Sequence, residues 1–313
     1  AGFEPAREGP AGIGRVGDSQ GKVFKANFTR MNGVYATIEN QLKDAAATRD
    51  EQPTTNAQSE TFDPHFEPGF FNNAPSGVAF RNCFVRLHPT TFDVEQLPHS
   101  PENRALFMLP FDYVENTPTP VWNKYLDDVW DSFDELERGY RVDFLEEWIG
   151  ATLLGNITKH ALCLFWIGPG SNGKSVGLDF ISGMFPRETI CSVPPQRWHN
   201  PFEVERIAGM RINICEESPN IDITGIDKFK AIIAGSPVEA CKKHQDFYRF
   251  RPTAGHVFAL NELHGTKDLS DGYWRRVAPM AFNRKFDIKT ADVGFGQKLS
   301  RETSGVIGHA IHA

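Results

Sequence analysis

The apolar positions change their spacing along the chain, and each spacing predicts a different kind of element. Short β-type runs separated by turn residues come first and predict a small β region at residues 78–80, 84–87 and 107–109. From Pro120 onward, apolar residues recur every three or four positions, as they do along one face of a helix. We expect Gly139 to end this first helix and Gly155 to end a second one.

From residue 161 onward, strand-like and helix-like segments alternate. Apolar runs predict strands at residues 161–167, 211–215 and 257–260, with helices at 174–184 and 226–234 between them. Such alternation predicts an α/β fold with a mostly parallel sheet covered on both faces. The chain is therefore expected to have three parts, namely a linker-like segment at 1–76, a β region with a helical domain at 77–158, and the sheet domain at 159–313.

Composition and charge narrow the class of protein. The 313 residues are 40% hydrophobic and 23% charged, an ordinary balance for a globular protein. No apolar run approaches the ~20 residues of a membrane-spanning helix, and the five scattered cysteines lack C-x-x-C spacing. We therefore expect a cytoplasmic protein with no membrane partner. The net charge of −7 argues against coating nucleic acid with the whole surface, but it is compatible with one small basic element.

A motif of the form G-x-x-x-x-G-K-[ST] follows the apolar run at 161–167 and opens the next helix. Its residues are Gly168, Pro169, Gly170, Ser171, Asn172, Gly173, Lys174 and Ser175. A strand before and a helix after are the context of a phosphate-binding loop, whose glycines let backbone N–H groups surround phosphates. Lys174 would reach the β- and γ-phosphates and the Ser175 hydroxyl would hold Mg²⁺, so ATP with Mg²⁺ is the expected ligand.

Two later strands end in polar residues. Glu216 and Glu217 follow the strand at 211–215, and we assign Glu216 mainly to the metal and Glu217 mainly to the base that polarises the attacking water. Alone, this pair would be a solvated strand end, but its position downstream of a phosphate loop favours a catalytic role. Asn261 ends the next strand, where it either orients the attacking water or is a simple turn residue.

Two consecutive arginines, Arg275 and Arg276, stand on a short turn before an apolar run. A guanidinium delivered across a subunit boundary would stabilise a phosphoryl group during its transfer. We favour Arg276 for this role and keep Arg275 as a close second. The alternative is a pair of surface arginines, or an Arg275 paired within its own subunit.

A locally basic hairpin is predicted between the acidic strand and Asn261. Residues 238–240 and 247–250 are β-type runs that flank a polar tip, and this tip carries Lys242, Lys243 and His244. Lysine and histidine at a hairpin tip suit contact with nucleic-acid phosphates without reading of bases. A solvated charged hairpin is the competing interpretation.

These motifs, in this order, resemble the superfamily 3 helicases, and more closely the helicase part of the phage/plasmid primase–helicase family. The loop keeps the family's G-x-G-x-N-G-K-S form, and Asn261 and residues 274–276 match its Asn-containing strand and its Trp-Arg-Arg. The hairpin pattern is met at Gly235, Ala240, Lys242, Lys243, Phe250 and Pro252, whereas Ser236 and Cys241 stand where the family usually has Asp and Arg. The resemblance covers residues 77–313 and does not extend to the first 75.

The resemblance implies an AAA+-type P-loop ATPase core that forms a ring, expected to be a homo-hexamer, with the helices of residues 119–155 in an oligomerising collar. ATP would lie between subunits, Arg276 would come from the neighbour, and Lys243 and His244 would move one DNA strand through the channel, typically 3′ to 5′. The implied partners are single-stranded and forked DNA during phage or plasmid replication in a bacterial or archaeal cell. A start without Met, and a helix beginning near Ser304, are expected of a fragment of a longer polypeptide with a primase or polymerase domain.

Three other functions use some of the same parts. A nucleotide kinase would leave the basic hairpin and the arginine pair unexplained. A ring clamp that binds ATP without hydrolysing it is disfavoured by Lys174 and by the two consecutive glutamates. An AAA+ ATPase that packages or remodels nucleic acid or protein without unwinding needs the same residues as a helicase, so it stays the alternative.

Overall fold

The structure is a computed structural model, and it describes residues 76–216, 223, 225–262, 271–287, 289, 292 and 294–313. The linker-like segment predicted for residues 1–76 therefore lies outside the described residues, apart from Ser76. Within the described part of the chain, no helix is both long and apolar enough to span a bilayer.

A small antiparallel sheet opens the described part of the chain. It contains β1 (Val78–Ala79), β2 (Phe84–Leu87) and β3 (Val94–Leu97), in that order. The strand predicted at residues 107–109 is wrong, because only a single bridge joins Met108 to Ala79. The third strand of the sheet is instead β3, which pairs with β2 and whose partly exposed Val-Glu-Gln-Leu sequence gives a weak apolar signal.

Helices follow this sheet: α2 (Pro120–Val129), α3 (Glu135–Leu153) and α4 (Ile157–His160). The prediction that Gly139 ends the first helix is wrong, since Gly139 lies inside α3 at an open surface position. The break comes earlier, where the Asp134 side chain accepts a hydrogen bond from the backbone N of Glu137 at 2.8 Å and caps the new helix. Gly155 directly after α3 has φ +75°, which confirms the predicted stop.

The main sheet is parallel throughout its described pairings, as the alternation predicts. Its order is β10 (Val277–Ala281), β4 (Cys163–Ile167), β9 (Gly255–Leu260), β6 (Ile212–Cys215) and β5 (Ile190–Cys191). The two-residue β5 was not predicted, because a strand this short carries no period. Short 3-10 turns cover Pro101–Asn103, Arg187–Thr189 and Pro195–Arg197.

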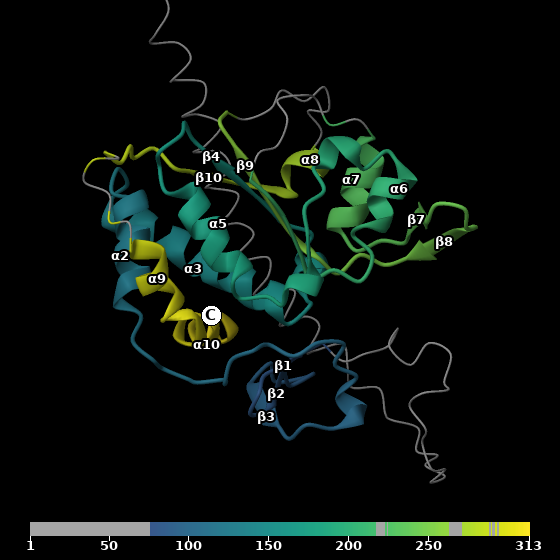
Figure 1. The fold of residues 1–313 in the computed structure, drawn as a ribbon, viewed down its shortest axis with the longest axis horizontal. Helices are drawn as coiled ribbons and strands as arrows, with labels where there is room; N and C mark the ends of the chain where they lie inside the picture. The colour runs from purple at the N-terminus through teal and green to yellow at the C-terminus, as the bar shows by residue number, and fades with distance from the viewer. Residues whose placement is uncertain are drawn as a thin grey trace, which may run out of the picture. The chain divides into compact units, whose positions relative to one another are not determined.

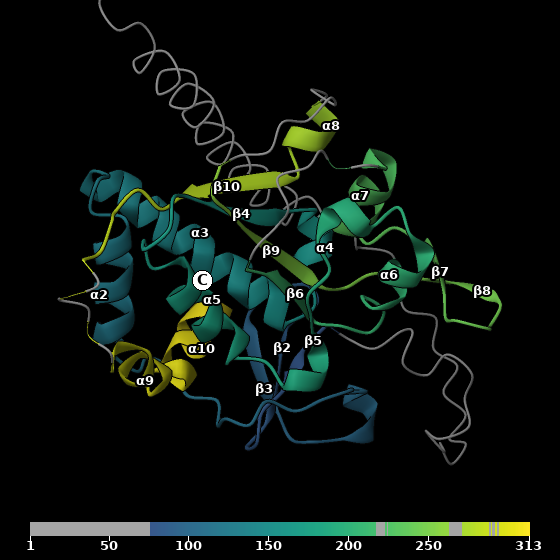
Figure 2. The ribbon, with the colours of Figure 1, turned by 45° about the horizontal axis from the view of Figure 1, so that its top comes forward.

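Alternate side chains of β4 enter two different cores. Trp166 packs against the Phe282 ring at 4.8 Å on the side of α5 (Lys174–Ser182), while Phe165 packs edge-on against Phe258 at 5.5 Å on the other side. Figures 1 and 2 show α2, α3 and α5 on one side together with α9 (Phe295–Ser300) and α10 (Thr303–His312). The opposite side carries α6 (Pro201–Glu205), α7 (Ile226–Ile233) and α8 (Asp271–Trp274).

The predicted hairpin is confirmed as a separate two-stranded sheet. Its strands are β7 (Val238–Cys241) and β8 (Phe247–Phe250), paired antiparallel with Cys241 opposite Phe247. In both ribbon views the hairpin extends away from the main sheet (Figure 2). Its inward face joins the core through Val238 and Ala240, which anchors the base and leaves the tip exposed.

Candidate functional site

The topology brings three of the predicted polar segments to one edge of the main sheet. Because the strands are parallel, the residues that follow β4, β9 and β6 all emerge at their carboxyl ends. Gly168 follows β4, Asn261 follows β9 and Glu216 follows β6, with β9 in the middle. We call residues 168–175, Asn261 and Glu216 together the loop edge. Glu217 lies outside the described residues.

The shape of the loop is fixed by a buried asparagine and two close approaches. Asn172 donates from Nδ2 to the carbonyl oxygen of Phe282 at 3.1 Å, just beyond β10. Gly168 lies so close to this segment that a Cβ there would be 2.2 Å from the same oxygen, so only glycine fits. The backbone N of Phe286 donates to the Ser171 oxygen at 2.8 Å, which braces the loop from the β10 side.

Lys174 is buried within the loop it follows. Its ammonium donates to the carbonyl oxygen of Gly168 and, at 3.3 Å, to Oδ1 of Asn172. Burial lowers the pKa of Lys174, so an anion bound beside it would favour its charged form. The loop thus combines a desolvated cation with the N-terminus of α5, an arrangement that can hold phosphate groups. The loop residues that face solvent are Pro169, Gly170, Ser171 and Ser175.

Two exposed side chains that carry oxygen atoms complete the loop edge. The Ser175 hydroxyl is on the first turn of α5, and the Glu216 carboxylate stands at the end of β6. One hydroxyl and one carboxylate form the hard, oxygen-only donor set that suits Mg²⁺, an ion that keeps several waters and takes phosphate oxygens as further ligands. The residues present therefore fit the expected ion.

The two arginines, Arg275 and Arg276, lie at the amino ends of the strands, opposite the loop edge, and they differ in their surroundings. They directly precede β10, whose first residue pairs with the first residue of β4. Arg276 donates from Nε to the Lys230 oxygen at 3.2 Å and from Nη1 to the Gly272 oxygen, so it ties α7 to α8. Burial, and to a smaller extent the neighbouring guanidinium, lowers the pKa of Arg276. Arg275 is exposed to solvent.

The hairpin tip (residues 242–246) presents the predicted basic residues to solvent. Lys242, Lys243 and His244 are exposed, and Lys242 Nζ lies 3.6 Å from a carboxylate oxygen of Glu205. The tip is closed by the buried Cys241, whose Sγ lies 3.2 Å from each of two backbone oxygens of the tip that share its one S–H donor. This contact gives Cys241 a structural role.

An exposed aromatic residue beside the hairpin tip was not among the predicted site residues. Phe247 is 65% exposed and stands opposite Cys241 at the start of β8. The strand alternation could have found it, since Tyr248 and Phe250 turn inward while Phe247 and Arg249 turn outward. An outward aromatic ring beside lysines is the combination that binds single-stranded nucleic acid.

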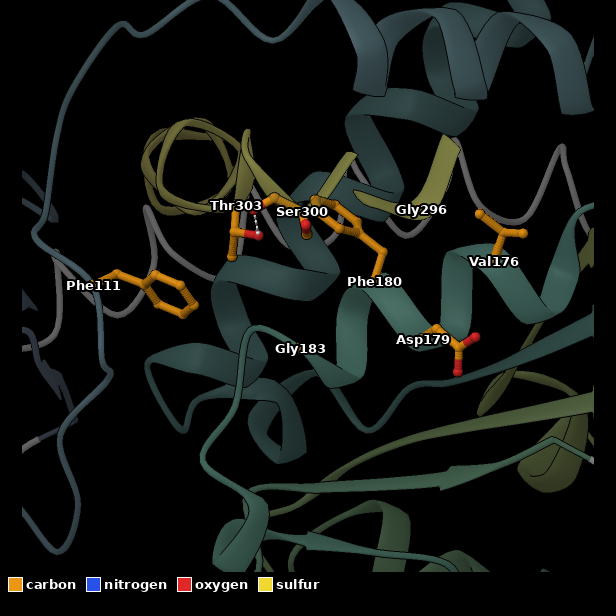
Figure 3. Close-up of a pocket in the computed structure, with 8 residues that line it drawn as sticks. All are labelled: Phe111, Val176, Asp179, Phe180, Gly183, Gly296, Ser300 and Thr303. Carbon is orange, nitrogen blue, oxygen red and sulfur yellow. Dashed lines mark hydrogen bonds between the residues drawn. The ribbon is translucent and has the colours of Figure 1, made fainter. Parts of the chain in front are cut away.

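A pocket of about 320 Å³ lies against the outer face of α5 (Figure 3). The Asp179 carboxylate and the rings of Phe111 and Phe180 contribute to its wall, and α9 and α10 supply Ser300 and Thr303. None of the predicted site residues lines this pocket.

The comparisons with known proteins support the fold and name no activity. A family of unknown function, DUF5906, matches residues 166–276, about a third of the chain. No curated protein matches. Among solved structures, three of the C-terminal region of NrS-1 are 15%, 13% and 12% identical, with TM-scores of 0.48, 0.51 and 0.49. Each is matched over 64% of this chain, which spans about half the length of those chains, 46–47%. At this identity, the match with TM-score 0.51 shows a shared fold alone.

Proposed function

We propose that this chain is an ATP-driven motor of the helicase kind that moves single-stranded DNA. The observation that carries the proposal is that different kinds of residue lie at the two ends of the strands of the main sheet. A loop suited to phosphates shares one edge with Asn261 and Glu216, and an exposed arginine precedes β10 at the other edge. A basic hairpin stands apart from both.

At the loop edge, the chain's residues bind ATP and position a water. Backbone N–H groups of the loop and the N-terminus of α5 hold the phosphates, and Lys174 exchanges its bond to Gly168 for the β- and γ-phosphates. Ser175 and Glu216 would hold Mg²⁺, which would supply positive charge beside the phosphates. Asn261 orients the attacking water, whose oxygen forms a bond to the γ-phosphorus while Glu217 accepts its proton. The bond between the γ-phosphorus and the bridging oxygen breaks, and ADP leaves with that oxygen.

The distance across the sheet favours catalysis between two copies of the chain. The strands β4 and β10 are five residues long, so the arginines stand roughly 15 Å from the loop of their own chain at ~3.3 Å per residue. An arginine that reaches the γ-phosphate must therefore come from another subunit. We assign this role to the exposed Arg275, since Arg276 is held by backbone oxygens of its own chain. A closed ring, with a hexamer as the expected size, provides such interfaces.

At the hairpin, Lys243 and His244 contact DNA phosphates and Phe247 stacks on a base. Hydrolysis at the loop edge would move the hairpins of a ring and draw the strand through its channel. Forked DNA is then the natural substrate, and a primase or polymerase domain in the same polypeptide is the expected companion in phage or plasmid replication.

The first test compares ATP hydrolysis with and without single-stranded DNA. We expect DNA to stimulate the wild-type protein and to have no effect on a Lys243→Ala, His244→Ala double variant. Stimulation that survives in the double variant would remove the hairpin from the DNA site. Hydrolysis that DNA never stimulates would favour the alternative of an AAA+ ATPase that remodels or packages without unwinding.

A further inference from the structure

The helix α2 contacts the phosphate loop directly, although it lies well before that loop in the chain. Tyr125 donates its hydroxyl to the carbonyl oxygen of Gly173 at 3.1 Å, and Gly173 is the residue before Lys174. The Tyr125 ring is buried, with Trp122 at 5.5 Å and Phe295 at 6.4 Å. Burial raises the pKa of Tyr125, so its hydroxyl keeps the proton that it donates.

Glycines on α5 make room for this contact. A Cβ at Gly177 would lie 2.1 Å from the Tyr125 hydroxyl oxygen, and a Cβ at Gly173 would lie 2.9 Å from Val129. Gly173 also has φ +87°, which the loop itself requires. Gly177 has no such backbone reason and is not part of the loop motif. Its lack of a side chain makes room for Tyr125 and for the Trp166 ring, which would lie 2.9 Å from the same Cβ.

Hydrogen bonds to distant parts of the chain hold α2 at both of its ends. The Glu302 carboxylate, from the segment before α10, accepts hydrogen bonds from the backbone N of Val121 at 3.0 Å and of Trp122 at 2.9 Å. A carboxylate at this place caps the helix and complements its dipole. Just past the other end of α2, Trp130 donates from its indole N to the Ala281 oxygen of β10 at 3.1 Å.

We infer that α2 clamps the phosphate loop through Tyr125, and that the clamp orients the N–H group with which the loop binds its ligand. The reason is the planar trans peptide, in which the carbonyl of Gly173 and the N–H of Lys174 point in opposite directions. The Gly173 carbonyl accepts the first backbone hydrogen bond of α5, from the N of Gly177 at 3.1 Å, and Tyr125 adds a second hydrogen bond to the same oxygen. The Lys174 N–H on the other side of this peptide faces the loop, where the nitrogen lies 3.4 Å from Oδ1 of Asn172. Tyr125 is thus a positioning residue for the nucleotide site. This inference rests on the ATP binding proposed above.

The test removes the hydroxyl oxygen of Tyr125 and keeps its ring. In Tyr125→Phe we expect about fivefold weaker binding of a fluorescent ATP analogue, which corresponds to the ~1 kcal/mol of one hydrogen bond. The matched control is Tyr113→Phe, because Tyr113 is also buried and its hydroxyl lies 2.9 Å from Nε2 of His312, away from the loop. Both variants should show a similar small fall in melting temperature, and only Tyr125→Phe should lose ATP affinity.

The outcomes separate this inference from the function on which it rests. Wild-type affinity in Tyr125→Phe would overturn the clamp and leave the ATPase intact, and so would an equal loss of affinity in Tyr113→Phe. A wild-type protein that binds no ATP would overturn both proposals. If Tyr125→Phe does not fold, Glu302→Gln loosens the same helix from its other end and should weaken ATP binding about twofold. Unchanged affinity in that variant would then count against the clamp.

Discussion

The loop edge and the hairpin tip are both suited to phosphates, yet they are built in opposite ways. At the loop edge, Asn172 and Lys174 are buried and are held by bonds to the loop and to the segment beyond β10. At the hairpin tip, Lys243 and His244 are exposed on a turn closed by local contacts. The loop is therefore shaped before any ligand arrives, whereas the tip presents exposed charges that can adapt to what they contact.

This difference suits the two ligands proposed for them. A nucleotide has one shape, and a rigid cradle aims N–H groups and one ammonium at it without reorganisation. A DNA strand in motion offers successive phosphates and bases, so flexible lysines and a flat ring bind each in turn. Substitutions at the loop edge should change ATP turnover, and those at the hairpin tip should change DNA binding.

The largest expected effect is that of Lys174→Ala. It removes the loop's only lysine ammonium, so hydrolysis measured as phosphate release should fall to the level of a blank. Removal of Lys174 relieves a desolvated cation but also takes a donor from the oxygens of Gly168 and Asn172, so the melting temperature should change little. The matched control is Lys124→Ala, whose exposed pair with Asp128 contributes little. Turnover that persists in Lys174→Ala would contradict the assignment of the loop.

Local sequence patterns predicted both the loop and the hairpin, because the residues that define each of them lie within a short stretch of sequence. The loop motif follows one apolar run, and the hairpin shows two β-type runs around a polar tip, so neither needs a distant residue to be found. The parallel sheet followed from the alternation of elements alone. The helix end predicted at Gly139 was wrong because an exposed glycine inside a helix costs only ~1 kcal/mol, and the cap at Asp134 decides where α3 begins.

What supports the loop could not be predicted, because it comes from far along the chain. Tyr125 is 48 residues from Gly173, and Glu302 is 180 residues from Trp122. No periodic pattern joins residues at such separations. The same limit applies to the arginines, since their sequence does not say which guanidinium meets the backbone oxygens of Lys230 and Gly272.

The next effect in size distinguishes the two arginines. Arg275→Ala should lower turnover about 10³-fold at an unchanged melting temperature, as expected for an arginine supplied between subunits. Arg276→Ala should instead lower the melting temperature, because two backbone oxygens lose their donor. The opposite pattern would return the catalytic role to Arg276.

Mixing two inactive variants tests whether the arginine acts between copies. A site between subunits needs Lys174 from one copy and Arg275 from the other, so a mixture of Lys174→Ala and Arg275→Ala proteins contains some complete sites. The mixture should therefore recover measurable turnover that neither variant shows alone. If co-assembled mixtures stay inactive, the loop and the arginine do not work in trans.

The smallest and most discriminating effect concerns Phe247. If its ring stacks on a base, Phe247→Ala should bind single-stranded DNA about tenfold more weakly, within the ~1–3 kcal/mol of such contacts. The wild-type protein should also prefer a normal strand to an abasic one, and this preference should vanish in the variant. Equilibrium titration with labelled strands measures both quantities.

The salt dependence of DNA binding distinguishes the contribution of the Phe247 ring from that of the lysines at the same tip. Removing a phosphate contact, as in Lys243→Ala, should reduce the slope of log affinity against log salt by about 0.7, whereas Phe247→Ala should leave that slope unchanged. Leu136→Ala on α3 is the control, because Leu136 is 67% exposed and lies far along the chain from the hairpin. If Phe247→Ala keeps the wild-type preference for bases, the tip binds only the backbone of the strand. The hairpin tip and the loop edge would then differ in their rigidity but not in the kind of group that they bind.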